Sequence, residues 1–123
     1  MEKPIDARNV TDTHSLLWYL LRSKRLSPKA AAIFSEIDEG KGQIHIPTIV
    51  LVEIVYLMEK AKIPKHAIKT VINMLDTSPS NYSLSPITLQ TIRALQSISR
   101  KKILDMPDRI ISATAANIAT VIW

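Results

Sequence analysis

The sequence predicts an α/β sandwich built on a parallel sheet, and three observations lead to this prediction. Short apolar runs with strand character alternate with longer runs of helical period. The only two glycines, Gly40 and Gly42, flank one lysine in a single turn, and several helical runs open at a proline. The chain has 123 residues, enough for one domain with its own core. Strands that alternate with helices pair in parallel, because each helix carries the chain back across the sheet.

The first half of the chain predicts two strands and three helices. The segment Ser27-Pro28 has the residue types of an N-cap and a first helical position. After the glycine turn, apolar and polar residues alternate as in a strand. The predicted elements are a strand ending at 10–12, helices over 13–21 and 28–38, a strand over 43–46, and a helix from 47–48 through 60.

The second half predicts three further helices and two strands. Pro64 opens a helix that ends near Leu75, and Ser85-Pro86 opens another that ends near Ser97. The remaining elements are a loop over 77–81, a strand over 82–84, a helix over 105–119, and a strand that begins over 121–123. Ligands of open parallel sheets bind beyond the C-terminal ends of the strands, so functional residues are expected just after each strand.

Composition excludes several classes of protein. An apolar fraction of 46% and a charged fraction of 22% argue against an intrinsically disordered chain. The lack of cysteine excludes disulfide scaffolds, thiolate metal sites and cysteine nucleophiles, and it fits a cytoplasmic protein. No apolar run is long enough to span a membrane, and the polar start of the chain does not resemble a signal peptide. No phosphate-binding glycine motif occurs.

The charge balance indicates a polyanionic partner. Sixteen Lys and Arg against eleven Asp and Glu give a net charge of +5. A basic small domain attracts nucleic acid, whereas the alternative is that the cations are solvated helix ends and loops. The basic residues gather in three clusters: Arg22, Lys24, Arg25 and Lys29; Lys60, Lys62, Lys65 and Lys69; and Arg100, Lys101 and Lys102.

Two acids stand where carboxylates need an explanation. Asp12 lies between a predicted strand and a predicted helix, where it is either an N-cap or part of a site. Glu53 is the only charged residue within the apolar segment 49–57. A carboxylate in a largely buried helix is costly unless it is paired or binds a cation. Its alternatives are an ion pair with Lys or Arg, or a narrow polar stripe with Thr48, Tyr56 and Lys60.

Two more acids open the last predicted helix. Asp105 has the position of an N-cap and Asp108 that of a first-turn acid, both of which suit the helix dipole. In an α/β fold Asp12 and Asp108 both lie at the C-terminal edge of the sheet, and Glu53 is about one and a half turns into a helix that starts there. Converging carboxylates repel one another unless a cation lies among them. Oxygen ligands without cysteine favour Mg²⁺ or Mn²⁺, which suit phosphoryl chemistry.

Other residues give weaker indications. His14 is the only histidine near the predicted pocket and is a candidate substrate contact, whereas His45 is expected to be a sheet residue. Trp18 and Tyr19 are expected in the core or at a dimer interface. With one phenylalanine and three tyrosines, the chain has few platforms on which bases stack.

Three segments together resemble the PIN-domain nucleases, in particular VapC-type toxins. The segment Val10–Leu20 resembles their opening strand and helix, and the helix around Glu53 resembles their second acidic position. The segment Asp105–Ala115 is similar to a D-P-x-D-R-x-I-x-A-T-A stretch of one subgroup, with Met106 in place of the proline and Pro107 one position later.

The resemblance implies a single domain over residues 1–123 with a three-layer α/β/α architecture. It implies RNA cleavage that depends on Mg²⁺ or Mn²⁺, with Asp12, Glu53 and Asp108 as catalytic metal ligands and Asp105 as an additional acid. Arg109 and His14 are the expected substrate contacts, and the first and third basic clusters are the candidates to hold RNA around the mouth of the pocket. The implied partners are RNA, a cognate antitoxin that blocks the site, and a second copy of the chain. The dimer is expected to use Leu17, Trp18 and Leu21 of the first helix.

The sequence departs from this family at its end. The family continues with a strand and a loop that carries a fourth acid, whereas this chain stops at Trp123, inside or just before that strand. One alternative is therefore a catalytically idle PIN-like module that binds RNA or protein. Another is a phosphoacceptor receiver domain, which is disfavoured because Asp12 stands alone after its strand and no acid follows the strand at 82–84.

Overall fold

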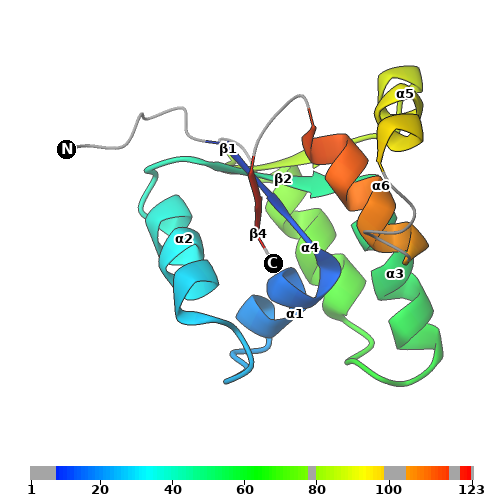
Figure 1. Ribbon diagram of the computed structural model, residues 1–123. Coiled ribbons are helices and arrows are strands. Elements are labelled where there is room, and N and C mark those ends of the chain that lie inside the picture. Colours follow the sequence, from blue (N-terminus) through cyan, green and yellow to red (C-terminus); the bar gives the residue numbers. More distant parts are fainter. Residues whose placement is uncertain (1–7, 78–79, 99–104, 117–119, 123) are drawn as a thin grey trace.

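A four-stranded parallel sheet forms the centre of the computed structural model, which describes residues 8–77, 80–98, 105–116 and 120–122 (Figure 1). The order of the strands across the sheet is β3-β2-β1-β4, and each neighbouring pair is parallel. The strands are β1 (Arg8–Thr11), β2 (Gln43–Pro47), β3 (Tyr82–Ser85) and β4 (Thr120–Ile122). The predicted parallel sheet is confirmed, and the chain reaches its final predicted strand, whereas Trp123 lies outside the described residues.

The order of the strands reverses at β1. The chain moves outward from β1 through β2 to β3, and then returns to add β4 on the other side of β1. Val10 therefore has His45 of β2 as its partner on one side and Val121 of β4 on the other. Such a reversal opens a crevice at the C-terminal ends of the strands, where ligands of α/β proteins bind. Asp12, the residue after β1, stands at this point.

Helices cover both faces of the sheet. In Figure 1 helices α5 and α6 lie above the sheet, and the other helices lie below it. Helix α6 packs against β1 and β4, whereas α3 packs against β2 and α4 against β3. The helices are α1 (Thr13–Leu20), α2 (Pro28–Asp38), α3 (Thr48–Glu59), α4 (Ala67–Asp76), α5 (Leu89–Ser97) and α6 (Met106–Ala115). No helix within the described ranges combines the length and the apolar character needed to cross a bilayer.

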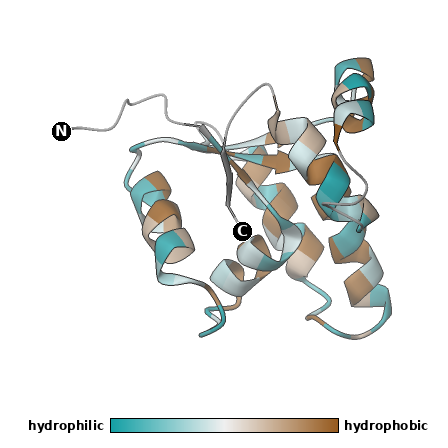
Figure 2. Ribbon diagram, viewed as in Figure 1, coloured by the Kyte–Doolittle hydropathy of each residue, from teal (hydrophilic) through white to brown (hydrophobic). Residues whose placement is uncertain are grey.

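Apolar residues from both layers meet around the sheet. Figure 2 shows brown apolar and teal polar segments alternating around the helices, as expected of helices with one buried face. Tyr19 stacks on the buried ring of Phe34, with centroids 4.3 Å apart, so Tyr19 packs on the core, one of its two expected places. The side chains without any exposed surface include Val10, Leu16, Phe34, Ile44, Ile46, Val50, Ile54, Val71 and Ile111.

Two predicted helices begin later than the sequence indicated. Pro64 forms a turn that accepts a hydrogen bond from the N–H of Ala67, where α4 begins. Ser85 ends strand β3 instead of opening a helix, and Thr88 becomes the N-cap of α5 through a capping box with Thr91. The predicted first residues of α4 and α5 were wrong, because a proline often precedes a helix without determining which later residue begins it. Helix α6 is described as far as Ala115, and 117–119 lie outside the described residues.

Three helices end in a left-handed residue. Arg22, Gly40 and Ala61 follow α1, α2 and α3 with φ angles of 54°, 82° and 56°. The next N–H in each case donates to a carbonyl five residues earlier, as Lys62 does to Leu57 at 2.9 Å. Only Gly40 has the residue type that adopts this conformation without a steric cost.

Candidate acidic active site

Asp12 occupies the end of the central strand and caps the first helix. Its backbone is extended, and its Oδ1 accepts a hydrogen bond of 3.1 Å from the N–H of Ser15. The N-cap alternative is therefore correct as a description of the side chain. It does not exclude a role in a site, because the cap bond holds a half-buried carboxylate at the C-terminal edge of β1.

Glu53 is anchored by a hydroxyl group rather than by a cation. The Oγ1 of Thr13, a residue only 2% exposed, donates to Oε1 of Glu53 at 2.5 Å. Within the described ranges, no lysine or arginine lies within ion-pair distance of Glu53. Burial raises the pKa of Glu53 above its ordinary value, and the bond from Thr13 opposes this shift. The carboxylate of Glu53 is thus held at the start of α1 by Thr13, and burial makes its charged form costly.

Asp105 and Asp108 stand together at the start of α6. Asp105 is the N-cap, and its Oδ2 accepts a hydrogen bond of 3.4 Å from the N–H of Asp108. The predicted capping role of Asp105 is confirmed. Asp108 is half-buried in the first helical turn, so its charge is less well solvated than that of an ordinary surface acid.

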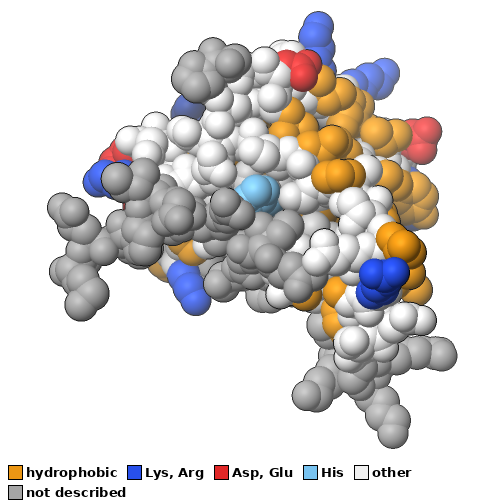
Figure 3. Space-filling view, turned by 90° about the horizontal axis from the view of Figure 1, so that it is seen from above, with side chains coloured by type: hydrophobic (Ala, Val, Ile, Leu, Met, Phe, Trp, Pro, Cys, Tyr) orange, Lys and Arg blue, Asp and Glu red, His pale blue; other side chains and the backbone are white. Residues whose placement is uncertain are grey.

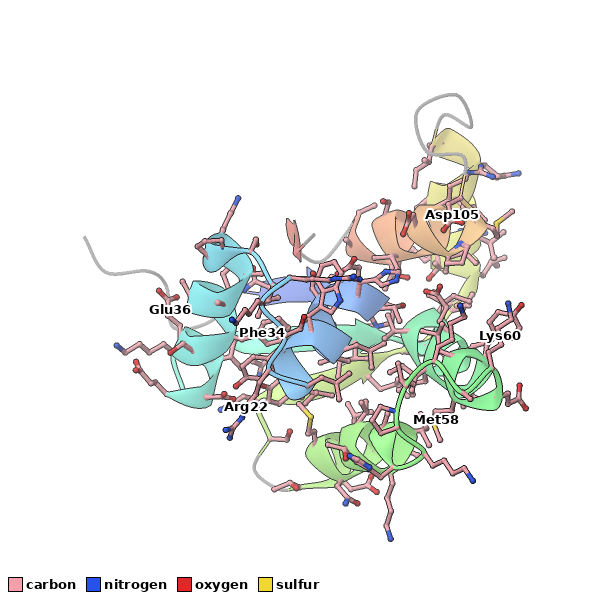
Figure 4. The ribbon with its side chains drawn as sticks, turned by 90° about the horizontal axis from the view of Figure 1, so that it is seen from below. Arg22, Phe34, Glu36, Met58, Lys60 and Asp105 are labelled. Carbon is pink, nitrogen blue, oxygen red and sulfur yellow. The ribbon has the colours of Figure 1, made fainter. Side chains whose placement is uncertain are left out.

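The four acids influence one another electrostatically. Burial raises the pKa of Asp108 most, and the charges of Asp105 and then Asp12 raise it further. Asp105 and Asp108 also raise the pKa of Glu53, after the larger effect of burial. Helix α3 contacts both α1 and α6, and Figure 4 places Asp105 on the side of the molecule where α3 and α6 lie (Figure 4). The structure thus brings acids from three distant segments into one electrostatic field.

The ligand atoms of the four acids are of the type that a hard divalent cation prefers. The acids offer only carboxylate oxygens, and their repulsion would be relieved by a positive charge. In the part of the chain that the structure describes, however, no three of them lie close enough to hold one ion together. Mg²⁺ commonly takes only one or two carboxylates and completes its shell with water and substrate phosphates. The arrangement therefore suits a weakly held ion rather than a closed protein cage.

The two predicted substrate contacts occupy different places. His14 is exposed in the first turn of α1, 5.6 Å from the half-buried ring of Trp18. Its charge lowers the pKa values of Glu53 and Asp108, so it lies in the field of the acids. Nη2 of Arg109 instead donates to the carbonyls of Leu95 and Ile98, both at 3.5 Å, at the end of α5. A contact between Arg109 and a substrate stays a prediction.

The structure also locates features that sequence reasoning missed or misplaced. Thr13 was not singled out, because a threonine at the start of a helix gives no sign of a partner 40 residues away. Figure 4 separates Arg22 from Asp105 across the molecule, so this member of the first basic cluster does not lie beside the acids. The third cluster, 100–102, lies outside the described residues. His45 is a sheet residue as expected, and its Nδ1 lies 3.3 Å from Oγ of Ser85.

Comparison with known families agrees with the geometry. The family model for the PIN domain matches residues 10–122, which is almost the whole chain and includes all four acids. A search of curated proteins finds no match.

Proposed function

Because the chain belongs to the PIN-domain family, whose members are generally nucleases, we propose that it is a metal-dependent endoribonuclease. The observation that carries the proposal is the electrostatic coupling between Asp12, which follows β1 where the strand order reverses, and the acids at the start of α6. Asp108 carries a pKa raised by burial and by the charges of Asp105 and Asp12. No described lysine or arginine forms an ion pair with these acids, so their mutual repulsion is not relieved. Acids in this state suit a site that binds a cation.

Each acid has a defined part in this proposal. Asp12, Glu53 and Asp108 would hold Mg²⁺ or Mn²⁺, with Asp105 as an additional acid. The bound ion supplies the charge that stabilises a phosphodiester and acidifies water. The cap bond from Ser15 keeps Asp12 in place, and the hydroxyl of Thr13 holds one oxygen of Glu53, which leaves the other oxygen without a bond to Thr13. Exposed His14, in the same field, would contact a phosphate.

The finer assignment is a VapC-type toxin that acts in the cytoplasm and is blocked by a cognate antitoxin. It rests on the resemblance of Val10–Leu20 and Asp105–Ala115 to that group and on the net charge of +5, which suits RNA. Co-purification of the chain with the product of an adjacent reading frame tests the antitoxin. Growth arrest on expression, relieved by that product, is the expected result.

A homodimer belongs to the same proposal, but the structure changes which residues are available for its interface. Leu17 of the first helix is buried, being only 3% exposed, so it is not available to a partner, whereas Leu21 is 42% exposed and Trp18 is half-buried. Figure 3 shows apolar side chains gathered along one side of the molecule (Figure 3). Leu89 and Ile92 of α5 are 66% and 44% exposed, so α5 offers a second apolar surface for a symmetric contact, with Leu89 more exposed than Leu21. Light scattering of a Leu89→Lys variant should show a monomer where the parent protein shows a dimer.

A catalytically idle PIN-like module is the second candidate. It is favoured by one observation, that no three acids of the described ranges are gathered closely enough to hold one ion. Such a module would bind RNA or protein without cleaving either. The following comparison separates it from the nuclease.

Purified protein without any bound partner is incubated with a panel of cellular RNAs, with Mg²⁺, with Mn²⁺, or with a chelator. The nuclease predicts cleavage only with a divalent ion, and Asp12→Asn should abolish it. Asp76→Asn is the matched control, because Asp76 is an exposed acid in the last position of α4, outside the described acidic site. Equal cleavage by Asp12→Asn and the parent protein would falsify the mechanism, and RNA binding without cleavage would establish the idle module.

A further inference from the structure

One face of helix α3 begins at Glu53 of the acidic site and continues toward the end of the helix. Glu53, Tyr56 and Lys60 are spaced at i, i+3 and i+7. At about 100° per residue they lie within about 60° of one another around the helix, and at about 1.5 Å per residue they span about 10 Å of its axis. The face that begins at the acids therefore continues through an aromatic ring to a cation just beyond the end of α3, the C-cap residue Lys60.

The ring and the cation are both accessible. Tyr56 is 54% exposed, which is unusual for a large side chain in a helix that also packs on the core. Nζ of Lys60 lies 4.5 Å from the centre of the ring, and no carboxylate of the described residues forms an ion pair with it. A cation–π contact at an exposed site is weak, so the ammonium can leave the ring for a stronger anionic partner.

The position of Lys60 distinguishes it from the other basic residues. In Figure 4 Lys60 and Asp105 lie on the same side of the molecule, whereas Arg22 lies toward the opposite side. Helices α3 and α6, which carry Glu53 and Asp108, are in direct contact. A chain of phosphates that passes the acids thus meets Lys60 before it meets Arg22.

We propose that this face of α3 is a subsite for single-stranded RNA, in which one base stacks on Tyr56 and a neighbouring phosphate binds Lys60. The inference rests on the proposed nuclease function and extends it, because it assigns the path of the strand next to the site. An aromatic ring accepts any base, since every base has a π face, and an ammonium binds a phosphate as a point charge. The subsite therefore holds a strand of any sequence beside the acids.

A protein partner is the competing occupant of this face. Val52 and Val55 on the same helix are 56% and 41% exposed, and apolar surface of this kind also suits a protein contact. RNA is favoured because the ring is paired with a cation that no described carboxylate neutralises, and because the same helix face carries Glu53 of the proposed nuclease site. A protein contact would need neither feature.

Binding of a short single-stranded RNA with one 2-aminopurine tests the subsite. The Asp12→Asn background prevents cleavage, and both fluorescence anisotropy and 2-aminopurine emission are recorded. Tyr56→Leu should weaken binding by about 5- to 150-fold and restore emission, whereas Tyr56→Phe should bind like the background. Lys60→Gln should weaken binding and lower the slope of log affinity against log salt by about 0.7. Val55→Leu and Lys41→Gln are matched controls on exposed positions, since Lys41 lies outside the three basic clusters, and they should change neither readout.

Two results would overturn the inference. One is that Tyr56→Leu binds the RNA with unchanged affinity and emission. The other is that its loss of binding accompanies a change of oligomeric state in light scattering, which assigns the face to a protein contact. The two proposals fail separately. A parent protein that cleaves RNA while Tyr56→Leu binds normally refutes only the subsite, whereas an inactive parent with a clear Tyr56 effect refutes only the nuclease.

Discussion

Asp12 performs two tasks that substitution can separate. Its carboxylate caps α1 by accepting the N–H of Ser15 at 3.1 Å, and its charge raises the pKa of Asp108. Asparagine caps a helix about as well as aspartate but carries no charge, whereas alanine loses both functions. Asp12→Asn therefore removes the charge alone, and the difference between the asparagine and alanine variants measures the cap.

The expected magnitudes follow from these contacts. Loss of the cap in Asp12→Ala should cost about 1 kcal/mol of unfolding free energy, within a range of about 0.5–2. For a chain of this length that corresponds to a fall in Tm of about 4 °C. Asp12→Asn should keep the cap and relieve repulsion of Asp108, so its Tm near neutral pH should equal or exceed that of the parent protein. Its RNA cleavage should nevertheless be lost.

The pH dependence provides an independent measure. A carboxyl whose folded pKa is raised binds protons more tightly when folded, so stability falls as pH rises from its ordinary value through the folded value. For Asp108 the ordinary value is 3.8, and the penalty is fully present above the raised pKa. Removal of the Asp12 charge should bring the pKa of Asp108 closer to 3.8, measured by carboxyl NMR titration of both proteins.

Three assays on the same variants decide the matter: thermal unfolding, NMR titration of Asp108, and cleavage of RNA with Mn²⁺. Asp76→Asn serves as the control, since it removes one acid outside the site and should leave all three readouts unchanged. An Asp12→Asn variant that is as unstable as Asp12→Ala would show that the cap assignment is wrong. An unchanged pKa of Asp108 would refute the electrostatic coupling on which the site is argued.

Further predictions concern the rest of the site and its support. Glu53→Gln should raise Tm near neutral pH but have little effect near pH 4, because burial raises the pKa of Glu53 above 4.5 and penalises only its charged form; thermal scans across that range test this. Ala61→Gly should stabilise the protein by about 0.5–1 kcal/mol in urea unfolding, because it relieves a left-handed φ of 56°. Gly40→Ala should destabilise the protein by a similar amount because its φ is 82°. The space around Gly40 is open, so the added methyl group meets no atom and the cost comes from the backbone angle alone. Ile54→Ala, at a side chain with no exposed surface beside Glu53, should cost about 2–5 kcal/mol in the same measurement.

Local patterns predicted much of the fold. Ser27 caps α2 by accepting the N–H of Ala30 at 3.1 Å, and Pro28 occupies the first turn, both as expected from residue type. Helix α1 and strand β2 also lie within one residue of the predicted bounds. These features were predictable because capping and periodicity depend on residues within one or two turns of each other.

The start of α5 shows where local patterns fail. Ser85-Pro86 has the residue types of a helix start, yet Ser85 belongs to β3 and its carbonyl accepts a bond from Thr48 on another element. The capping box of Thr88 and Thr91 then sets the helix start three residues later. Ser85 is held in the strand by its pairing with Pro47 of β2 and by the bond from Thr48, 37 positions away, neither of which a local pattern contains.

The sequence by itself determined which acids stand at strand and helix ends, the parallel order of the elements, and the basic net charge. Only the tertiary structure decided that Thr13 anchors Glu53, that Arg109 caps α5, and that Arg22 lies far from Asp105. The physical reason is range. Caps and periodicity arise from neighbouring residues, whereas a hydroxyl–carboxylate bond across 40 residues and the repulsion of acids on three helices exist only once the sheet brings those segments together.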